Sequence, residues 1–211
     1  GRGLGASASL ATAITRAFYD FFDAELPQKD LLFYANFSEN ITHGKSSGID
    51  VATVNSEHPL WFIKDSTIEP FELNLHGFIV IGDTGVHGFT SQAINIVREK
   101  LVEEKEKTQD SINHLGQLAT DSKDFLMTDK LKEFGHVMNK AHERLSDLGV
   151  SHPRLDNLVE TARKNGALGA KLTGSGLGGV MVALAENEKD AIRISQRLLK
   201  NGAKNTWIYS F

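Results

Sequence analysis

The 211-residue sequence contains no cysteine, and its charge is nearly balanced, at a formal −4. Without cysteine the chain forms no disulfide scaffold, no iron–sulfur cluster and no thiol-based active site. The near-neutral charge gives no reason to expect nucleic acid or an anionic membrane as a partner. Apolar runs such as residues 77–81 are far too short to span a bilayer, and no signal peptide is visible. These absences predict a soluble, cytoplasmic protein.

The spacing of apolar residues predicts an α+β protein. Helical spacing and helix-ending residues predict helices over residues 8–22, 28–40, 90–107, 111–125, 129–148, 152–165 and 187–201, with a short one opening at Asp50. Strands are predicted over residues 60–63, 68–73, 77–82, 169–173, 179–185 and 205–211. A change of character near residues 70–78 predicts two domains, 1–75 and 76–211.

Two glycine-rich loops are the strongest local signals in the chain. GRGLGASAS occupies residues 1–9 and leads into a helix, and KLTGSGLGG occupies residues 171–179 between two strands. Glycine allows positive φ and close approach of the backbone, so successive N–H groups converge on an anion near a helix N-terminus. The two loops therefore predict a site for nucleotide phosphates.

The first loop lacks the GxxxxGK[ST] spacing of a Walker-type site and has no visible strand before it, which also argues against a dinucleotide fold. It offers two hydroxyls, on Ser7 and Ser9. A serine here can ligate Mg²⁺ or a phosphate oxygen, because hard cations prefer oxygen ligands. Alternatively, Ser7 only caps the helix.

Glu39 and Asp50 lie at the two edges of a polar loop that contains HGKSSGID. Phosphoryl transfer needs a carboxylate that holds Mg²⁺ and often a second that orients or deprotonates the attacking hydroxyl. Taken singly, Asp50 reads as an ordinary helix N-cap and Glu39 as a solvated acid. His43 has no serine or aspartate partner at motif spacing, and His136 and His142 lie on nearly opposite sides of one helix, which argues against zinc.

In combination these segments resemble the GHMP kinase superfamily. GRGLGASA resembles its ATP loop GxGLGSSA, with Ala6 in place of the first serine, and KLTGSGLGG resembles its C-terminal glycine motif. ENITHGKSSGIDVAT is similar to the intervening motif, with Ser46 where proline is usual, and DTGVHGFTSQA is similar to the strand–turn–helix in which a threonine begins the helix. The resemblance covers essentially the whole chain, and the HGxSSGID segment favours the branch of the superfamily that phosphorylates mevalonate.

The resemblance implies the GHMP kinase fold, with part of a ribosomal-S5-like N-terminal lobe and a ferredoxin-like C-terminal domain. It implies ATP and Mg²⁺ as cofactors and the conversion of mevalonate to 5-phosphomevalonate. Asp50 would be the catalytic acid that handles the proton of the C5 hydroxyl, and Ser7 and Glu39 would be the Mg²⁺ ligands. The nucleotide-binding residues would be Gly1, Arg2, Gly3, Leu4, Gly5, Ala6, Ser7, Ala8, Thr90, Gly174, Ser175 and Gly176.

The chain departs from the superfamily pattern at its beginning. Members carry a further N-terminal portion with a lysine thought to assist the catalytic aspartate, and Lys45 does not match that motif. The chain thus looks like a C-terminal fragment, with impaired catalysis and an uncovered apolar face on its first helix. A homodimer is the family expectation. The alternatives are a kinase of the same superfamily acting on phosphomevalonate or homoserine, and a non-catalytic nucleotide-binding fragment.

Overall fold

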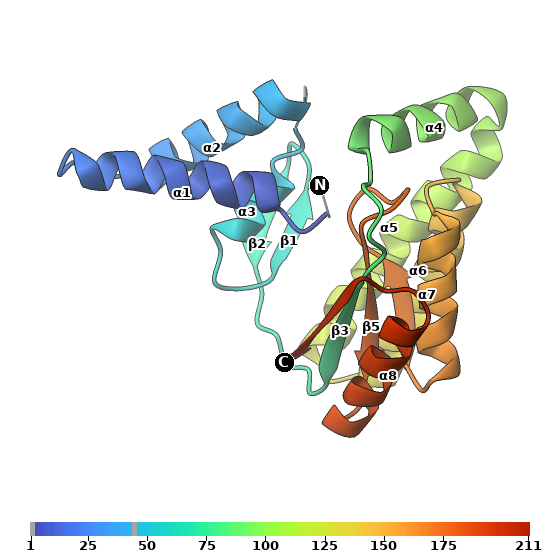
Figure 1. Cartoon of the computed structure of the whole chain (residues 1–211). Coiled ribbons are helices and arrows are strands. Elements are labelled where there is room, and N and C mark those ends of the chain that lie inside the picture. The colour runs from blue at the N-terminus through green and yellow to red at the C-terminus, as the bar shows by residue number, and fades with distance from the viewer. Residues whose placement is uncertain (1–2, 44–45) are drawn as a thin grey trace. The chain divides into compact units, whose positions relative to one another are not determined.

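The computed structural model describes residues 3–43 and 46–211, with only the backbone at residues 42 and 43. These residues form two compact units, Gly3–Leu73 and Asn74–Phe211. Figure 1 shows the first in blue to cyan and the second in green to red. Gly1, Arg2 and Lys45 lie outside the described residues.

The first unit contains three helices and one hairpin. The helices are α1 (Ala6–Phe21), α2 (Gln28–His43) and α3 (Ile49–Val54), and the hairpin joins β1 (Leu60–Ile63) to β2 (Thr67–Pro70). Its small core consists of buried alanines of α1 and α2 and a valine of α3, namely Ala8, Ala11, Ala35 and Val51. Small side chains let the helices pack closely, as the alanine-rich sequence predicts.

The first unit also exposes a broad apolar surface on α1. Leu10, Ile14, Phe18 and Phe21 recur at helical spacing, and Phe21 is 81% exposed. The uncovered apolar face predicted for the first helix is confirmed. Aromatic residues of α2, such as Phe33 and Phe37, are exposed as well. Two helices of this unit thus expose large apolar side chains, whereas its core consists of small ones.

The second unit contains a four-stranded antiparallel sheet in the order β4-β5-β3-β6. Its strands are β3 (Phe78–Asp83), β4 (Gly169–Leu172), β5 (Val180–Ala185) and β6 (Asn205–Ser210). The register pairs Val80 with both Ala183 and Ile208, so these residues share one face. Because β4 and β5 are consecutive neighbours, the second glycine-rich segment is the connection between two paired strands.

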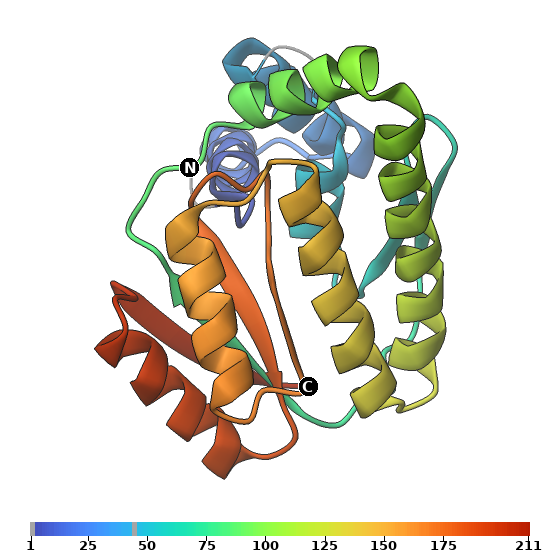
Figure 2. The ribbon, with the colours of Figure 1, turned by 90° about the vertical axis from the view of Figure 1, so that its right-hand side faces the viewer.

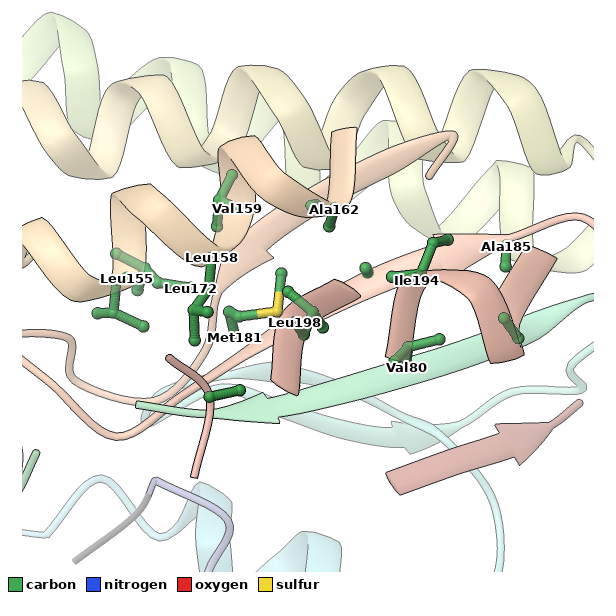
Figure 3. Close-up of a cluster of buried hydrophobic side chains, with 14 residues drawn as sticks. Val80, Leu155, Leu158, Val159, Ala162, Leu172, Met181, Ala185, Ile194 and Leu198 are labelled. Carbon is green, nitrogen blue, oxygen red and sulfur yellow. The ribbon is translucent and has the colours of Figure 1, made fainter. Parts of the chain in front are cut away.

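Five helices complete the second unit: α4 (Thr90–Glu103), α5 (Lys105–Met127), α6 (Leu131–Asp147), α7 (Pro153–Lys164) and α8 (Glu188–Lys200). Figure 3 shows side chains of α7 and α8 meeting those of β3 and β5 in the main core. Its largest members are Leu155, Leu158, Leu172, Met181, Ile194 and Leu198. In Figure 2 β5 is seen between α7 and α6, and β4 contacts both helices.

The predicted elements are present, with shifts at several boundaries. The strand predicted over residues 68–73 is Thr67–Pro70, and the helix predicted over residues 28–40 continues to His43. The break expected between residues 107 and 111 lies at Glu104, and α5 already contains Thr108. Thr108 is buried, and its hydroxyl donates to the carbonyl of Lys100. This hydrogen bond links the first turn of α5 to the last turn of α4, so α5 begins before residue 111, where a helix start was predicted. Within residues 3–43 and 46–211, no helix is both long and apolar enough to cross a membrane.

Two adjacent leucines of α8 give a matched test of the core. Leu198 is 0% exposed and Leu199 is 48% exposed. We expect Leu198→Ala to lower the free energy of unfolding by about 2–5 kcal/mol, because a cavity is left in the core. Leu199→Ala should cost less than about 1 kcal/mol, since surface changes have small effects. Urea unfolding followed by circular dichroism measures both, and equal losses would contradict the described core.

Candidate nucleotide and phosphoryl-transfer site

The first glycine loop ends in a left-handed turn at the start of α1. Gly3 and Gly5 have positive φ, 76° and 66°. Gly5 is the N-cap of α1 and no side chain caps the helix, so the reading of Ser7 as the cap is wrong. Ser7 lies in the first turn, and the hydroxyl of Ser9 donates to the carbonyl of Gly5 at 3.0 Å. The N–H groups of the first turn lack intrahelical partners, which suits an anion.

Asp50 lies beside this turn. A Cβ placed on Gly5 would be 4.0 Å from the Cβ of Asp50 and 3.2 Å from a methyl of Val54. Glycine therefore lets the loop backbone lie close against α3. The N-cap of α3 is Gly48, with φ 84°, and Asp50 is in the first turn and exposed. The interpretation of Asp50 as the N-cap is therefore wrong, because Gly48 occupies the N-cap position and Asp50 is the second residue of the helix.

Glu39 is buried, at 3% exposure, in α2. The interpretation of this residue as a solvated acid is therefore wrong. Leu31 and Ala35, buried on the same helix, precede it at intervals of four residues, so all three lie on one face. A carboxylate is buried only where cations or hydrogen-bond donors offset its desolvation.

The loop between Glu39 and Asp50 is held by its own polar groups. The Ser46 N–H donates to Oδ1 of Asn40 at 2.9 Å, and the Gly48 N–H donates to Oγ of Ser46 at 3.1 Å. Ser46, which stands where proline is usual in the family motif, thus fixes the turn with its hydroxyl. The His43 side chain lies outside the described residues.

The second glycine loop depends on backbone conformations and contacts that exclude larger residues. Gly174 and Gly176 have φ of 74° and 78°. A Cβ on Gly176 would overlap the carbonyl oxygen of Val150, and a Cβ on Gly88 would lie 2.6 Å from the carbonyl oxygen of Gly176. The loop is therefore in close contact with the backbone on two sides.

Hydrogen bonds fix the same loop at its end. The Leu177 N–H donates to the Val150 carbonyl at 2.9 Å. The Gly179 N–H donates to the Val86 carbonyl at 2.8 Å, and the buried Thr84 hydroxyl donates to the Gly179 carbonyl at 2.7 Å. Two backbone bonds and one side-chain hydroxyl thus tie the end of the loop to Val150 and to the segment after β3.

Thr90 and Ser175 line one cavity of the second unit. The cavity has a volume of about 470 Å³ and is otherwise mainly apolar, lined by Ala93, Ile94, Val97, Arg98, Leu101 and Val150. Thr90 is the first residue of α4, as predicted. Two predicted site residues that lie far apart in the sequence are thus brought to one cavity.

The site residues that sequence reasoning missed are those that support the loops. Val150 holds the second loop through its carbonyl, and Gly88 and Thr84 contact the loop from the segment after β3. Their contribution is made by backbone atoms or by a short hydroxyl. No motif spacing predicts such contacts, although a glycine such as Gly88 can indicate that two backbone segments lie close together.

Comparison with known proteins identifies the class to which these loops belong. The profile of the GHMP kinases N terminal domain matches residues 1–56, and that of the GHMP kinases C terminal domain matches residues 123–204. The mevalonate kinase from methicillin-resistant Staphylococcus aureus, whose crystal structure is known, has 35% sequence identity to this chain. The two structures superpose with a TM-score of 0.75, covering 99% of this chain and 67% of that one. The chain therefore belongs to the GHMP kinase family.

Particular relatives narrow the comparison. The mevalonate kinase of Pyrococcus horikoshii is 36% identical over 190 residues, which cover 88% of this chain and 56% of the relative. The L. major mevalonate kinase, crystallised in complex with R-mevalonate, is 26% identical, with a TM-score of 0.91 over 100% of this chain and 66% of that one. The chain spans between 56% and 60% of the length of three Pyrococcus mevalonate kinases.

Two glycines of the second unit test the steric account of the loop. We expect Gly176→Ala to lower the free energy of unfolding by at least about 1–3 kcal/mol, the usual cost of forcing a side chain into a disfavoured backbone region. Gly116→Ala is the control, because nothing lies within 4 Å of its Cβ and α5 favours alanine by about 1 kcal/mol. Thermal unfolding compares the two variants, and a harmless Gly176→Ala would refute the close contact with Val150.

Proposed function

We propose that the protein containing this chain catalyses the ATP-dependent phosphorylation of mevalonate at its C5 hydroxyl. The observation that carries the proposal is the proximity of the Gly5 turn to Asp50 in the first unit, where a Cβ on Gly5 would lie 4.0 Å from the Asp50 Cβ. A phosphate-binding turn beside an exposed carboxylate brings an anion site next to a group that can accept a proton. The resemblance to mevalonate kinases, including one that binds R-mevalonate, supports the choice of substrate.

The residues of the first unit fit a magnesium nucleotide. Backbone N–H groups of the Gly5 turn and the first turn of α1 suit phosphate oxygens. The Ser7 hydroxyl and the buried Glu39 carboxylate are the oxygen donors that Mg²⁺ prefers. In kinases Mg²⁺ is held by one or two protein groups together with substrate phosphates, so a larger protein cluster is not required. When bound, Mg²⁺ would neutralise charge on the transferred phosphoryl group.

Asp50 would act on the attacking hydroxyl. It is exposed, in the first turn of α3. An ionised carboxylate can orient the C5 hydroxyl and accept its proton as the new O–P bond forms. Glycine at position 5 allows the loop backbone to lie close to Asp50, which supports a role for Asp50 beside the bound phosphates.

The second unit offers phosphate-binding groups of its own. Gly174, Ser175 and Gly176 carry N–H groups in a loop with positive φ at both glycines, and Thr90 shares a cavity with Ser175. Backbone donors that are already fixed stabilise phosphate charge without reorganising during the reaction. A homodimer and a cytoplasmic location remain part of the proposal, on the strength of the family resemblance.

Replacing Asp50 tests its chemical role. In the protein expressed from its complete reading frame, we expect Asp50→Asn to lower kcat at least ~100-fold, the usual scale for a positioned acid–base group. Asp30→Asn is the matched control, because Asp30 is also an acidic residue in the first turn of a helix of this unit. Mevalonate-dependent ADP release measures both, and wild-type turnover of Asp50→Asn would remove Asp50 from the mechanism.

The paired serines of α1 test the magnesium site. We expect Ser7→Ala to raise the Mg²⁺ concentration for half-maximal activity about tenfold, since one oxygen ligand is lost. Ser9→Ala should leave it nearly unchanged, because the Ser9 hydroxyl already bonds to the Gly5 carbonyl. Equal magnesium dependence in the two variants would show that Ser7 is not a ligand.

A further inference from the structure

Helix α6 lies in backbone contact with the edge strand β4. A Cβ on Gly169 would overlap the backbone of Gly135, and a Cβ on Gly135 would lie 2.7 Å from the carbonyl group of Leu168. The helix can approach the strand this closely only because both positions are glycine. Asn139 and His142 follow Gly135 by four and seven residues, so they share its face of α6 and reach the same strand.

Side chains replace a fifth strand along this edge. Oδ1 of Asn139 accepts from the Ala170 N–H at 3.0 Å, and its Nδ2 donates to the Leu168 carbonyl at 3.3 Å. Arg163 of α7 donates to the Ala170 carbonyl at 3.1 Å. These bonds satisfy backbone groups that point away from β5, which an unpaired edge would leave exposed.

His142 completes the edge at the last residue of β4. Its Nδ1 accepts from the Leu172 N–H at 3.3 Å, so the lone pair is on Nδ1 and the ring proton is on Nε2. Nε2 lies 3.3 Å from Oδ1 of Asp156, which also accepts from the hydroxyl of Ser151. His142 is 6% exposed. A buried imidazole is thus held in one tautomer by a strand on one side and a carboxylate on the other.

This chain of bonds joins the two anchors of the second glycine loop. Leu172 directly precedes the loop, residues 173–179, and Ser151 directly follows Val150, whose carbonyl accepts from Leu177 inside the loop. The path Leu172–His142–Asp156–Ser151 therefore connects the strand that enters the loop to the segment that holds its middle. A change in the position of His142 would therefore affect the loop at its entry, through Leu172, and at its middle, through Asp156 and Ser151.

The charges around His142 favour its neutral form. Burial lowers the pKa of His142, the positive charges of Arg163 and Lys171 lower it further, and Asp156 opposes them. Burial also lowers the pKa of Lys171 to about 8, and its Nζ donates to the Leu172 carbonyl at 2.7 Å. Arg163 pairs with Glu143 at 4.0 Å, so its charge is only partly balanced.

We propose that neutral His142 is a positioning residue for the glycine loop 173–179, through its bonds to Leu172 and Asp156, and that protonation of its Nδ1 releases the strand that enters the loop. The inference rests on the proposed function in one respect, that the loop contributes to nucleotide or substrate binding. Protonated histidine has no acceptor, so the N–H groups of Leu172 and Nδ1 would face each other. An unpaired buried amide then costs about 1–3 kcal/mol.

The sign of the pH effect follows from the direction of the shift. The folded protein binds a proton at His142 less readily than the unfolded chain, whose histidine has a pKa of about 6.5. Stability from this group is therefore fully present above about pH 6.5 and is lost as the pH falls through the lower pKa of the folded state. The bond to Leu172 should be lost over the same interval.

Amide hydrogen exchange tests the positioning role in the chain itself, without any ligand. We expect His142→Ala to lower the protection factor of the Leu172 amide about tenfold, in line with the loss of one buried hydrogen bond. In the wild type the protection factors of Leu172 and of residues 174–179 should fall as the pH is lowered from about 6.5 through the pKa of folded His142. His142→Gln should keep the protection and remove this pH dependence, because a neutral amide can both accept from Leu172 and donate to Asp156.

His136→Gln is the matched control, since His136 is an exposed histidine of the same helix. It should behave as the wild type. If His142→Ala fails to fold, the pH dependence of the Leu172 protection factor in His142→Gln, compared with the wild type, still tests the proposal. An unchanged Leu172 amide in His142→Ala, or the same acid-side loss in His142→Gln, would overturn the proposal.

Kinetics of the protein from its complete reading frame separate this inference from the proposed function. We expect His142→Ala to raise KM for ATP or mevalonate about fivefold, equivalent to about 1 kcal/mol, with a smaller change in kcat, and His142→Gln to restore it at pH 7. Lost loop protection with both KM values unchanged would leave the positioning of the loop by His142 standing and would overturn the contribution of the loop to binding. A wild-type protein that phosphorylates no acceptor would overturn the proposed function and leave the exchange result standing.

Discussion

The second unit depends on the contact between the backbone of α6 and the edge of β4. Gly135 and Gly169 permit that contact, because a Cβ at either position would clash with the backbone of the other element. Once the helix is this close, Asn139 and His142 can take the hydrogen-bonding places of a neighbouring strand. The sheet thus ends at a closed edge, and β4 enters the glycine loop at a fixed position. The geometry of the loop is a consequence of how its strand is held.

The two units use glycine for related purposes. In the first unit the Gly5 turn lies against α3 with Asp50 beside it, and in the second the loop around Gly176 lies against Val150. In both places the absence of a Cβ lets the loop backbone lie close to its neighbour. Backbone amides fixed in this way favour an anion that carries several oxygens, which is the chemistry expected of a phosphate-transferring family.

Much of this fold could be predicted from the sequence, because local patterns determine it. The strand Leu60–Ile63 follows from a short apolar run, and the start of α4 at Thr90 follows from the family motif. The burial of Glu39 was missed, although its spacing from Leu31 and Ala35 places all three on one helix face. That error came from reading the charge of the residue before its periodicity.

Other features could not be predicted, because they depend on segments far apart in the chain. The pairing of Gly135 with Gly169 and the bond from His142 to Leu172 require the packed structure. The sequence reading considered His142 only as a zinc ligand and rejected it, and its role as an acceptor for a strand has no motif. The N-cap of α3 was misassigned because Gly48, with its positive φ, ends the loop two residues before Asp50.

The most direct test of the account is the choice of phosphoryl acceptor. ADP release should be measured for the protein from its complete reading frame, beside the 211-residue chain, with mevalonate, phosphomevalonate and homoserine at equal concentrations. The account predicts the highest kcat/KM with mevalonate. ADP release that depends on another acceptor, or on none of the three, would contradict it.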